Sequence, residues 1–259
     1  MNGQPADVPS GGEPASGVEP DDSPALDPAP SAQAAPTLAE DLLLLLFQPG
    51  AGGRGSGAIA GEGTLFYVLA GAVVTELALG GHVRPEGDGG SAARVEAVAG
   101  RPPADALLHK AWEYIAVKPR GMQTVLAAIG PMLRKPVLDR VVARGDIRRT
   151  SRRALGLFET TVLLGDGGER RANLVAAVRS VLADGATPTP RVAALAALLS
   201  GSGALPQFYR EIPWNSAVAT RGKQLEQGDW GASAASEAVV RTLTAIVVSS
   251  VVVATQPRT

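Results

Sequence analysis

The chain has 259 residues, of which 45% are hydrophobic and 19% are charged, and its formal net charge is −1. This length suits one sizeable domain with a tail. The absence of cysteine excludes disulfide frameworks and thiolate metal sites, and it fits a cytoplasmic protein.

The first 36 residues differ in composition from the remainder. They are rich in Pro, Gly, Ser and Ala, and all their charged side chains are acidic. Such a segment cannot bury enough apolar surface to offset its chain entropy. The sequence therefore predicts a disordered acidic tail over residues 1–36, followed by one helical domain over residues 37–255.

The first helices are indicated by their ends and their periodicity. Thr37 and Glu40 have the spacing of a capping box, which predicts a helix over 38–47. The Gly-rich stretch 50–63 lacks the Gly-Lys-Ser/Thr ending of a phosphate-binding loop, so we expect a flexible loop. An apolar stripe at helical spacing then predicts a helix over 65–79.

Turn residues divide the rest of the chain into shorter elements. Short strands are expected at 82–84 and 95–98. Further helices are expected at 104–115, 121–130, 136–144, 171–183, 190–200, 206–227 (bent at Pro213) and 232–254. The apolar stretch 239–254 contains Arg241 and is shorter than the roughly 18 to 20 residues that a membrane span needs, which indicates a core helix.

The helix over 136–144 begins at a proline and ends before Gly145, as helices commonly do. A strand at 146–149, a turn at 150–153 and a returning strand at 155–158 are expected after it. The chain is thus predicted to be an all-α domain with a short protruding β-hairpin.

Basic residues are concentrated around this helix and hairpin. Residues 118–171 contain twelve Lys or Arg and five Asp or Glu, a local excess of seven positive charges. Such a segment attracts polyanions, and each Lys or Arg contributes roughly 1 kcal/mol at an anionic membrane surface. The candidate lipid-binding residues are Arg134, Lys135, Arg144, Arg148, Arg149, Arg152 and Arg153.

No catalytic pattern stands out. His82 and His109 have no neighbouring carboxylate at metal-ligand spacing, and no nucleophile-elbow pattern is present. We therefore expect no enzymatic activity, no metal and no cofactor.

Three segments, 37–45, 70–83 and 138–158, resemble in the same order the Golgi phosphoprotein 3 family, which includes a yeast sorting counterpart. The sequence Glu76-Leu77-Ala78-Leu79, followed by glycine and an apolar strand, is the distinctive core of the second segment. The resemblance extends over roughly residues 37–255. The abundance of Ala, Gly and Arg indicates a high-GC genome and hence a bacterial-type member.

The resemblance implies a compact helical domain that acts as a peripheral membrane adaptor. The family's eukaryotic members bind phosphatidylinositol 4-phosphate, hold glycosyltransferases by their cytosolic tails and can self-associate through the hairpin. For this chain it implies an acidic phospholipid partner, a protein client and a location at the inner face of a membrane. The residues implied in self-association are Leu155, Leu157 and Phe158.

The family's lipid pocket carries over only in part. Its Trp aligns near Gly61, and an Arg of the second helix aligns near Ala70. Arg134 matches one of two paired basic residues, whereas the other aligns near Pro131, with Lys135 adjacent to the match. Binding to an anionic membrane carries over, but the preference for phosphatidylinositol 4-phosphate rests on residues that this chain replaces.

The same helix and Arg-rich hairpin also allow a second interpretation, a winged-helix protein that binds nucleic acid. That interpretation predicts duplex binding with a steep salt dependence. The helix over 136–144 offers little beyond Asp139, Arg140 and Arg144 for reading bases, which favours the membrane interpretation.

Overall fold

The computed structural model describes residues 35–50, 55–86, 94–154, 158–230 and 238–255, and the tail expected to be disordered lies almost wholly outside them. Helices dominate this part of the chain, which confirms the all-α prediction. They are α1 (Leu38–Leu46), α2 (Leu65–Leu79), α3 (Ala106–Ala116), α4 (Met122–Ile129), α5 (Arg134–Ala143), α6 (Gly168–Leu182), α7 (Pro190–Gly201), α8 (Ser216–Glu226) and α9 (Ala238–Thr255). Short 3₁₀ turns are η2 (Glu62–Thr64), η3 (Gly130–Met132) and η4 (Leu205–Phe208).

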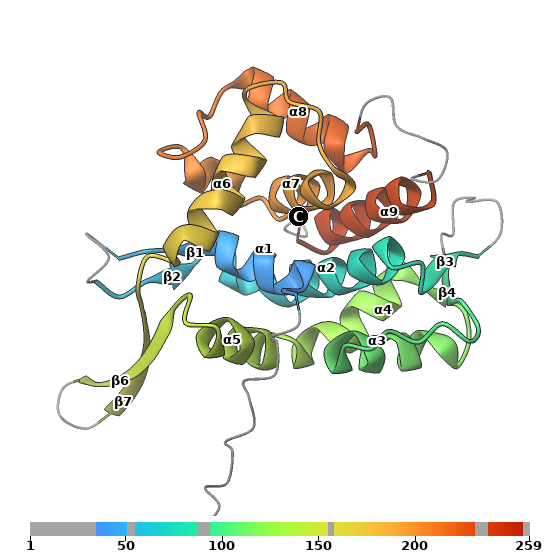
Figure 1. Cartoon of the computed structure of the whole chain (residues 1–259), viewed down its shortest axis with the longest axis horizontal. Coiled ribbons are helices and arrows are strands. Elements are labelled where there is room, and N and C mark those ends of the chain that lie inside the picture. The colour runs from blue at the N-terminus through green and yellow to red at the C-terminus, as the bar shows by residue number, and fades with distance from the viewer. Residues whose placement is uncertain (1–34, 51–54, 87–93, 155–157, 231–237, 256–259) are drawn as a thin grey trace, which may run out of the picture. The chain divides into compact units, whose positions relative to one another are not determined.

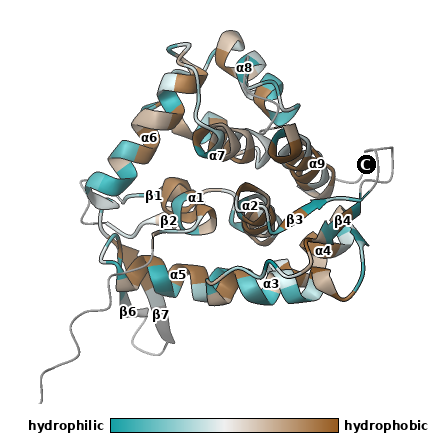
Figure 2. Ribbon diagram, turned by 45° about the vertical axis from the view of Figure 1, so that its right-hand side comes forward, coloured by the Kyte–Doolittle hydropathy of each residue, from teal (hydrophilic) through white to brown (hydrophobic). Residues whose placement is uncertain are grey.

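The helices form three layers. Helices α1 and α2 lie between α3, α4 and α5 on one side and α6 to α9 on the other (Figures 1 and 2). All nine residues of α1 are buried, as are most residues of α2. The apolar character of these two helices on all sides follows from their position, because a helix enclosed by others has no face in water.

Glycines allow α9 to pack closely against this core. A Cβ atom at Gly71 of α2 would lie 2.9 Å from Val247 Cγ1, and one at Gly201 of α7 would lie 2.5 Å from Val248 Cγ1. The expected core helix near the C-terminus is therefore confirmed. Within the described residues, one segment, Glu62–Leu79, is long and apolar enough to span a membrane, but most of it is buried inside the domain.

The strands are short and antiparallel. They are β1 (Phe47–Gln48) with β2 (Ala58–Ile59), β3 (Val83–Pro85) with β4 (Arg94–Ala97) and β5 (Arg120–Gly121), and β6 (Arg148–Ala154) with β7 (Phe158–Leu164). Strands β1, β2 and β5 were not predicted, because strands of two residues show no periodicity in the sequence.

The β6–β7 hairpin protrudes beside α5 (Figure 1). Its register runs from Arg148 opposite Leu164 to Ala154 opposite Phe158. The turn predicted at 150–153 is wrong, because those residues pair within β6. Their polar composition resembles that of a turn, but backbone pairing with β7 keeps these residues in an extended strand.

Helix boundaries also differ from prediction around two prolines, Pro213 and Pro136. The helix expected over 206–227 is divided into η4 and α8 by the segment around Pro213, and the Asn215 side chain accepts a hydrogen bond from Val218 N at 2.9 Å at the start of α8. Helix α5 begins two residues before Pro136, which is tolerated because the third N–H of a helix needs no partner within the helix.

Buried carboxylates fix α1 to its neighbours. Glu40 closes the predicted capping box with Thr37, accepting from its backbone N at 3.0 Å, and also accepts from Arg144 Nε at 2.7 Å. Asp41 accepts hydrogen bonds from Arg170 and Arg191, each at 2.7 Å. These pairs join α1 to α5, α6 and α7. They thereby fix the position of α5, and with it the position of its first turn, relative to α1.

Candidate functional site

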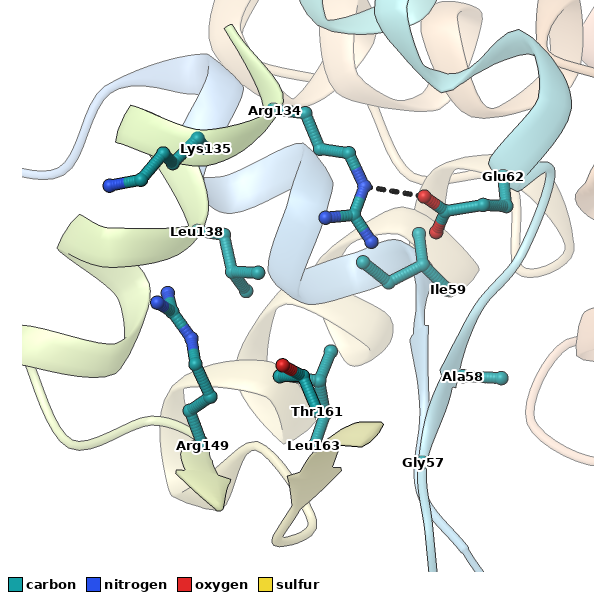
Figure 3. Close-up of a pocket in the computed structure, with 10 residues that line it drawn as sticks. All are labelled: Gly57, Ala58, Ile59, Glu62, Arg134, Lys135, Leu138, Arg149, Thr161 and Leu163. Atoms are coloured by element: carbon teal, nitrogen blue, oxygen red, sulfur yellow. Dashed lines mark hydrogen bonds and ion pairs between the residues drawn. The ribbon is translucent and has the colours of Figure 1, made fainter. Parts of the chain in front are cut away.

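A pocket of about 400 Å³ opens where α5, the hairpin and the segment before α2 meet (Figure 3). It is lined by Gly57, Ala58, Ile59, Glu62, Arg134, Lys135, Leu138, Arg149, Thr161 and Leu163. These residues come from three parts of the fold: the segment of β2 and η2, helix α5, and the β6–β7 hairpin.

The base of the pocket is apolar. Ile59, Leu138 and Leu163 are each no more than 8% exposed. A hydrogen bond from Gly57 N to Leu163 O, 2.8 Å long, ties the strand before η2 to the hairpin. The pocket floor is therefore continuous with the hydrophobic core, and its shape does not depend on exposed side chains.

Three cations surround this apolar base. Arg134 and Lys135 extend from the first turn of α5, and Arg149 extends from β6 toward them (Figure 3). Their side chains are 48%, 84% and 35% exposed, so a ligand from solution can reach each of them. The sequence analysis predicted all three as lipid-binding residues, and the fold brings them together.

Two carboxylates balance part of this charge. Glu62 accepts a hydrogen bond from Arg134 Nε at 2.5 Å (Figure 3). Asp139 accepts from Lys135 at 2.8 Å and also pairs with Arg149. The hydrogen bonds from Lys135 and then Arg149 hold the pKa of Asp139 below its ordinary value of 3.8. The cluster of three cations and two carboxylates thus has a net charge of +1.

The other predicted lipid-binding residues lie elsewhere. Arg144 points inward, where its side chain is 18% exposed and pairs with Glu40. Arg148 is exposed, but it precedes Arg149 in β6, so it lies on the opposite face of the hairpin. Arg152 and Arg153 continue the β6 backbone opposite Thr160 and Glu159.

Of the three residues implied in self-association, Phe158 is among those that the structure describes. Leu155 and Leu157 lie outside the described residues, and Phe158 begins β7, opposite Ala154. The described strands of the hairpin pair along their length and protrude from the domain. Self-association through the hairpin stays a prediction.

The local excess of positive charge does not form one continuous surface patch. Arg140 pairs with Asp105 at 2.6 Å, and Arg170 pairs with Asp146 at 2.5 Å as well as with Asp41. Arg171 is 5% exposed and pairs with Glu211. These arginines hold helices together, so counting charges along the sequence overestimated the charge available to a polyanion.

Glu62 is the pocket residue that sequence reasoning missed. It was assigned to a flexible loop, yet it begins η2 directly after Gly61, whose φ of 69° is in the left-handed region. The resemblance had already aligned Gly61 with a pocket residue, and this was the signal available for its neighbour. Ala70, the other replaced position, is fully buried in α2.

The two histidine rings contact a backbone carbonyl and a carboxylate, respectively. His82 Nδ1 lies 2.8 Å from Arg101 O, and His109 Nε2 lies 3.4 Å from Glu113. Among the residues described, no group of three or more His, Cys, Asp or Glu side chains is placed to hold a metal ion.

The fold and pocket define an all-helical protein with a basic, apolar-floored pocket at the base of a β-hairpin. The model of the family described as Golgi phosphoprotein 3 (GPP34) matches residues 38–242. The chain therefore belongs to the Golgi phosphoprotein 3 family. No curated protein matches the chain.

Proposed function

We propose that this chain is a peripheral membrane protein whose pocket binds the head group of an acidic phospholipid. The observation that carries the proposal is the convergence of Arg134, Lys135 and Arg149 around one accessible pocket. Guanidinium and ammonium groups form strong charge-assisted hydrogen bonds with phosphate oxygens, and arginine can do so through two N–H groups at once. Membership of the Golgi phosphoprotein 3 family supports association with a membrane.

The proposal includes a non-enzymatic adaptor role at the cytoplasmic face of a membrane, with a protein client bound elsewhere on the domain. Phosphatidylinositol 4-phosphate is the head group that the family resemblance suggests, and a bacterial-type member would meet other acidic phospholipids. The pocket has a net charge of +1, which a single phosphodiester would neutralise. We therefore propose acidic phospholipid as the ligand class.

The ion pairs of α5 make nucleic-acid binding less favourable. Asp139, Arg140 and Arg144 are the side chains that this helix would use to read bases. Arg140 contacts Asp105 and Arg144 contacts Glu40, so both would have to leave buried or largely buried partners. The pocket cations pair with the more exposed carboxylates of Glu62 and Asp139, so phosphate binding there disturbs less buried ion pairs.

Vesicle sedimentation tests the proposal. The full chain is mixed at low salt with vesicles of phosphatidylcholine alone or with added phosphatidylglycerol. We expect sedimentation with the acidic vesicles only. A triple variant with Arg134→Gln, Lys135→Gln and Arg149→Gln should lose most of this binding, because each substitution removes a charge but keeps a polar side chain.

A matched triple variant controls for the loss of total charge. Arg84→Gln, Arg94→Gln and Arg179→Gln remove three exposed arginines that also pair with carboxylates but lie outside the pocket. This control should retain most of the binding. The proposal fails if the wild-type chain does not sediment with acidic vesicles, or if both triple variants lose binding equally. Duplex binding in a mobility-shift assay, without vesicle binding, would favour the nucleic-acid interpretation.

A further inference from the structure

Glu62 introduces a negative charge beside the three cations that line the pocket. Its carboxylate accepts from Arg134 Nε, and its side chain is 49% exposed at the pocket edge (Figure 3). The Nη atoms of Arg134 face the pocket, and Glu62 is the acidic partner of this arginine among the described residues. The pocket therefore offers donors for an anion and, beside them, an acceptor for a cation.

This juxtaposition penalises a ligand that carries negative charge only. A phosphate that approaches the Arg134 guanidinium also approaches the Glu62 carboxylate, and like charges a few ångströms apart repel each other. A ligand that carries a primary ammonium next to its phosphate avoids this repulsion, because the ammonium can donate hydrogen bonds to Glu62.

We propose that the pocket selects a phospholipid head group that carries a primary ammonium together with its phosphate, with phosphatidylserine as the best match. This inference rests on the proposed function. The phosphate would meet Arg134 and Arg149, and the ammonium would meet Glu62. The net charge of −1 on this head group then neutralises the +1 of the pocket.

Glu62 is a specificity residue in this proposal, and phosphatidylglycerol provides the matching comparison. Phosphatidylserine and phosphatidylglycerol both carry a net charge of −1, so vesicles with equal fractions of either have the same surface charge. Only phosphatidylserine has an ammonium. Any difference in binding between the two vesicle types therefore reports on head-group chemistry and not on the surface potential of the vesicle.

The experiment measures sedimentation of the full chain with both vesicle types. Wild type should prefer phosphatidylserine by about two- to fivefold, the range expected for one partly exposed ion pair. Glu62→Gln should bind phosphatidylglycerol more tightly than wild type does and should lose the preference. The control Glu96→Gln removes a partly exposed carboxylate that pairs with Arg84 outside the pocket, and it should keep the wild-type preference.

Two further measurements keep the test decisive. Thermal unfolding of Glu62→Gln should match that of wild type, since the residue is half exposed, and glycerophosphoserine should compete better than glycerophosphoglycerol for the wild-type chain. Equal binding to both vesicle types, a preference for phosphatidylglycerol, or a preference retained by Glu62→Gln would overturn this inference alone. If the chain bound neither phosphatidylserine vesicles nor phosphatidylglycerol vesicles, the proposed function itself would be overturned.

Discussion

Arg144 at the end of α5 donates from Nε to Oε1 of Glu40 in α1, 2.7 Å away, although 104 residues separate the two in sequence. Glu40 is fully buried, and Arg140 Nη1 lies 3.6 Å from its other oxygen. The same carboxylate closes the capping box with Thr37. The pair therefore stabilises the start of α1 and fixes the position of the helix that carries Arg134 and Lys135.

Replacing Glu40 with alanine should strongly destabilise the fold. The substitution would leave the Arg144 guanidinium without its carboxylate in a largely buried position, and loss of one partner of a buried pair costs about 3 to 5 kcal/mol. Urea unfolding followed by circular dichroism would measure the change. Glu96→Ala, at an exposed pair, is the control and should change stability by less than about 1 kcal/mol. Similar losses in both variants would contradict this account of the buried pair.

Stability should decrease in acid through Glu40. Burial alone would raise the pKa of this carboxyl, but the hydrogen bond from Thr37 N and the Arg144 guanidinium outweigh burial and hold the pKa below its ordinary value of 4.5. A lowered folded-state pKa contributes stability that is fully present above the unfolded-state pKa and is lost as the pH falls through the folded-state value.

The difference in unfolding free energy between wild type and Glu40→Gln should therefore stay constant between about pH 7 and 5 and narrow below about pH 4.5. Urea unfolding at a series of pH values would show this. A difference that is unchanged down to about pH 3 would contradict the linkage.

Substitutions of Arg144 and of Arg134 should have different effects, the first on stability and the second on membrane binding. Arg144→Gln should cost about 2 kcal/mol or more of stability, because it leaves buried Glu40 with a weaker partner. Arg134→Gln should change stability by less than about 0.5 kcal/mol, since its pair with Glu62 is half exposed, yet it should weaken binding to acidic vesicles severalfold. Unfolding and sedimentation of both variants at one temperature would test the contrast. If Arg144→Gln left stability unchanged and abolished vesicle binding, Arg144 would belong to the lipid site.

Gly130 should tolerate no side chain. A Cβ atom there would lie 2.7 Å from the carbonyl oxygen of Phe66, so Gly130→Ala requires α2 and η3 to move apart and should cost about 1 to 3 kcal/mol. Gly63→Ala is the matched control, because nothing lies within 4 Å of the position that its added methyl group would take, and its effect should stay within about 0.5 kcal/mol. Thermal unfolding of both variants would check the difference, and equal melting temperatures would contradict it.

Much of the fold was readable from local patterns. The capping box at Thr37 and Glu40 placed the start of α1, and the apolar run over 65–79 gave the bounds of α2. These features depend on residues within one helical turn of each other, so their spacing is visible along the sequence. The two-residue strands were missed, and the break at Pro213 was expected only as a bend within one helix, because each depends on a partner or a packing contact elsewhere in the chain.

The candidate site divides in the same way. The sequence alone determined a helical domain of the Golgi phosphoprotein 3 type and a basic segment that includes Arg134, Lys135 and Arg149. Only the tertiary structure decided that Arg144 pairs with buried Glu40 and that Glu62 enters the pocket from before α2. The physical reason is that the position of a charged residue in the sequence does not determine which opposite charge it will pair with. Folding brings together charged groups as much as 150 residues apart, such as Asp41 and Arg191, and these pairings determine which arginines remain available to a ligand.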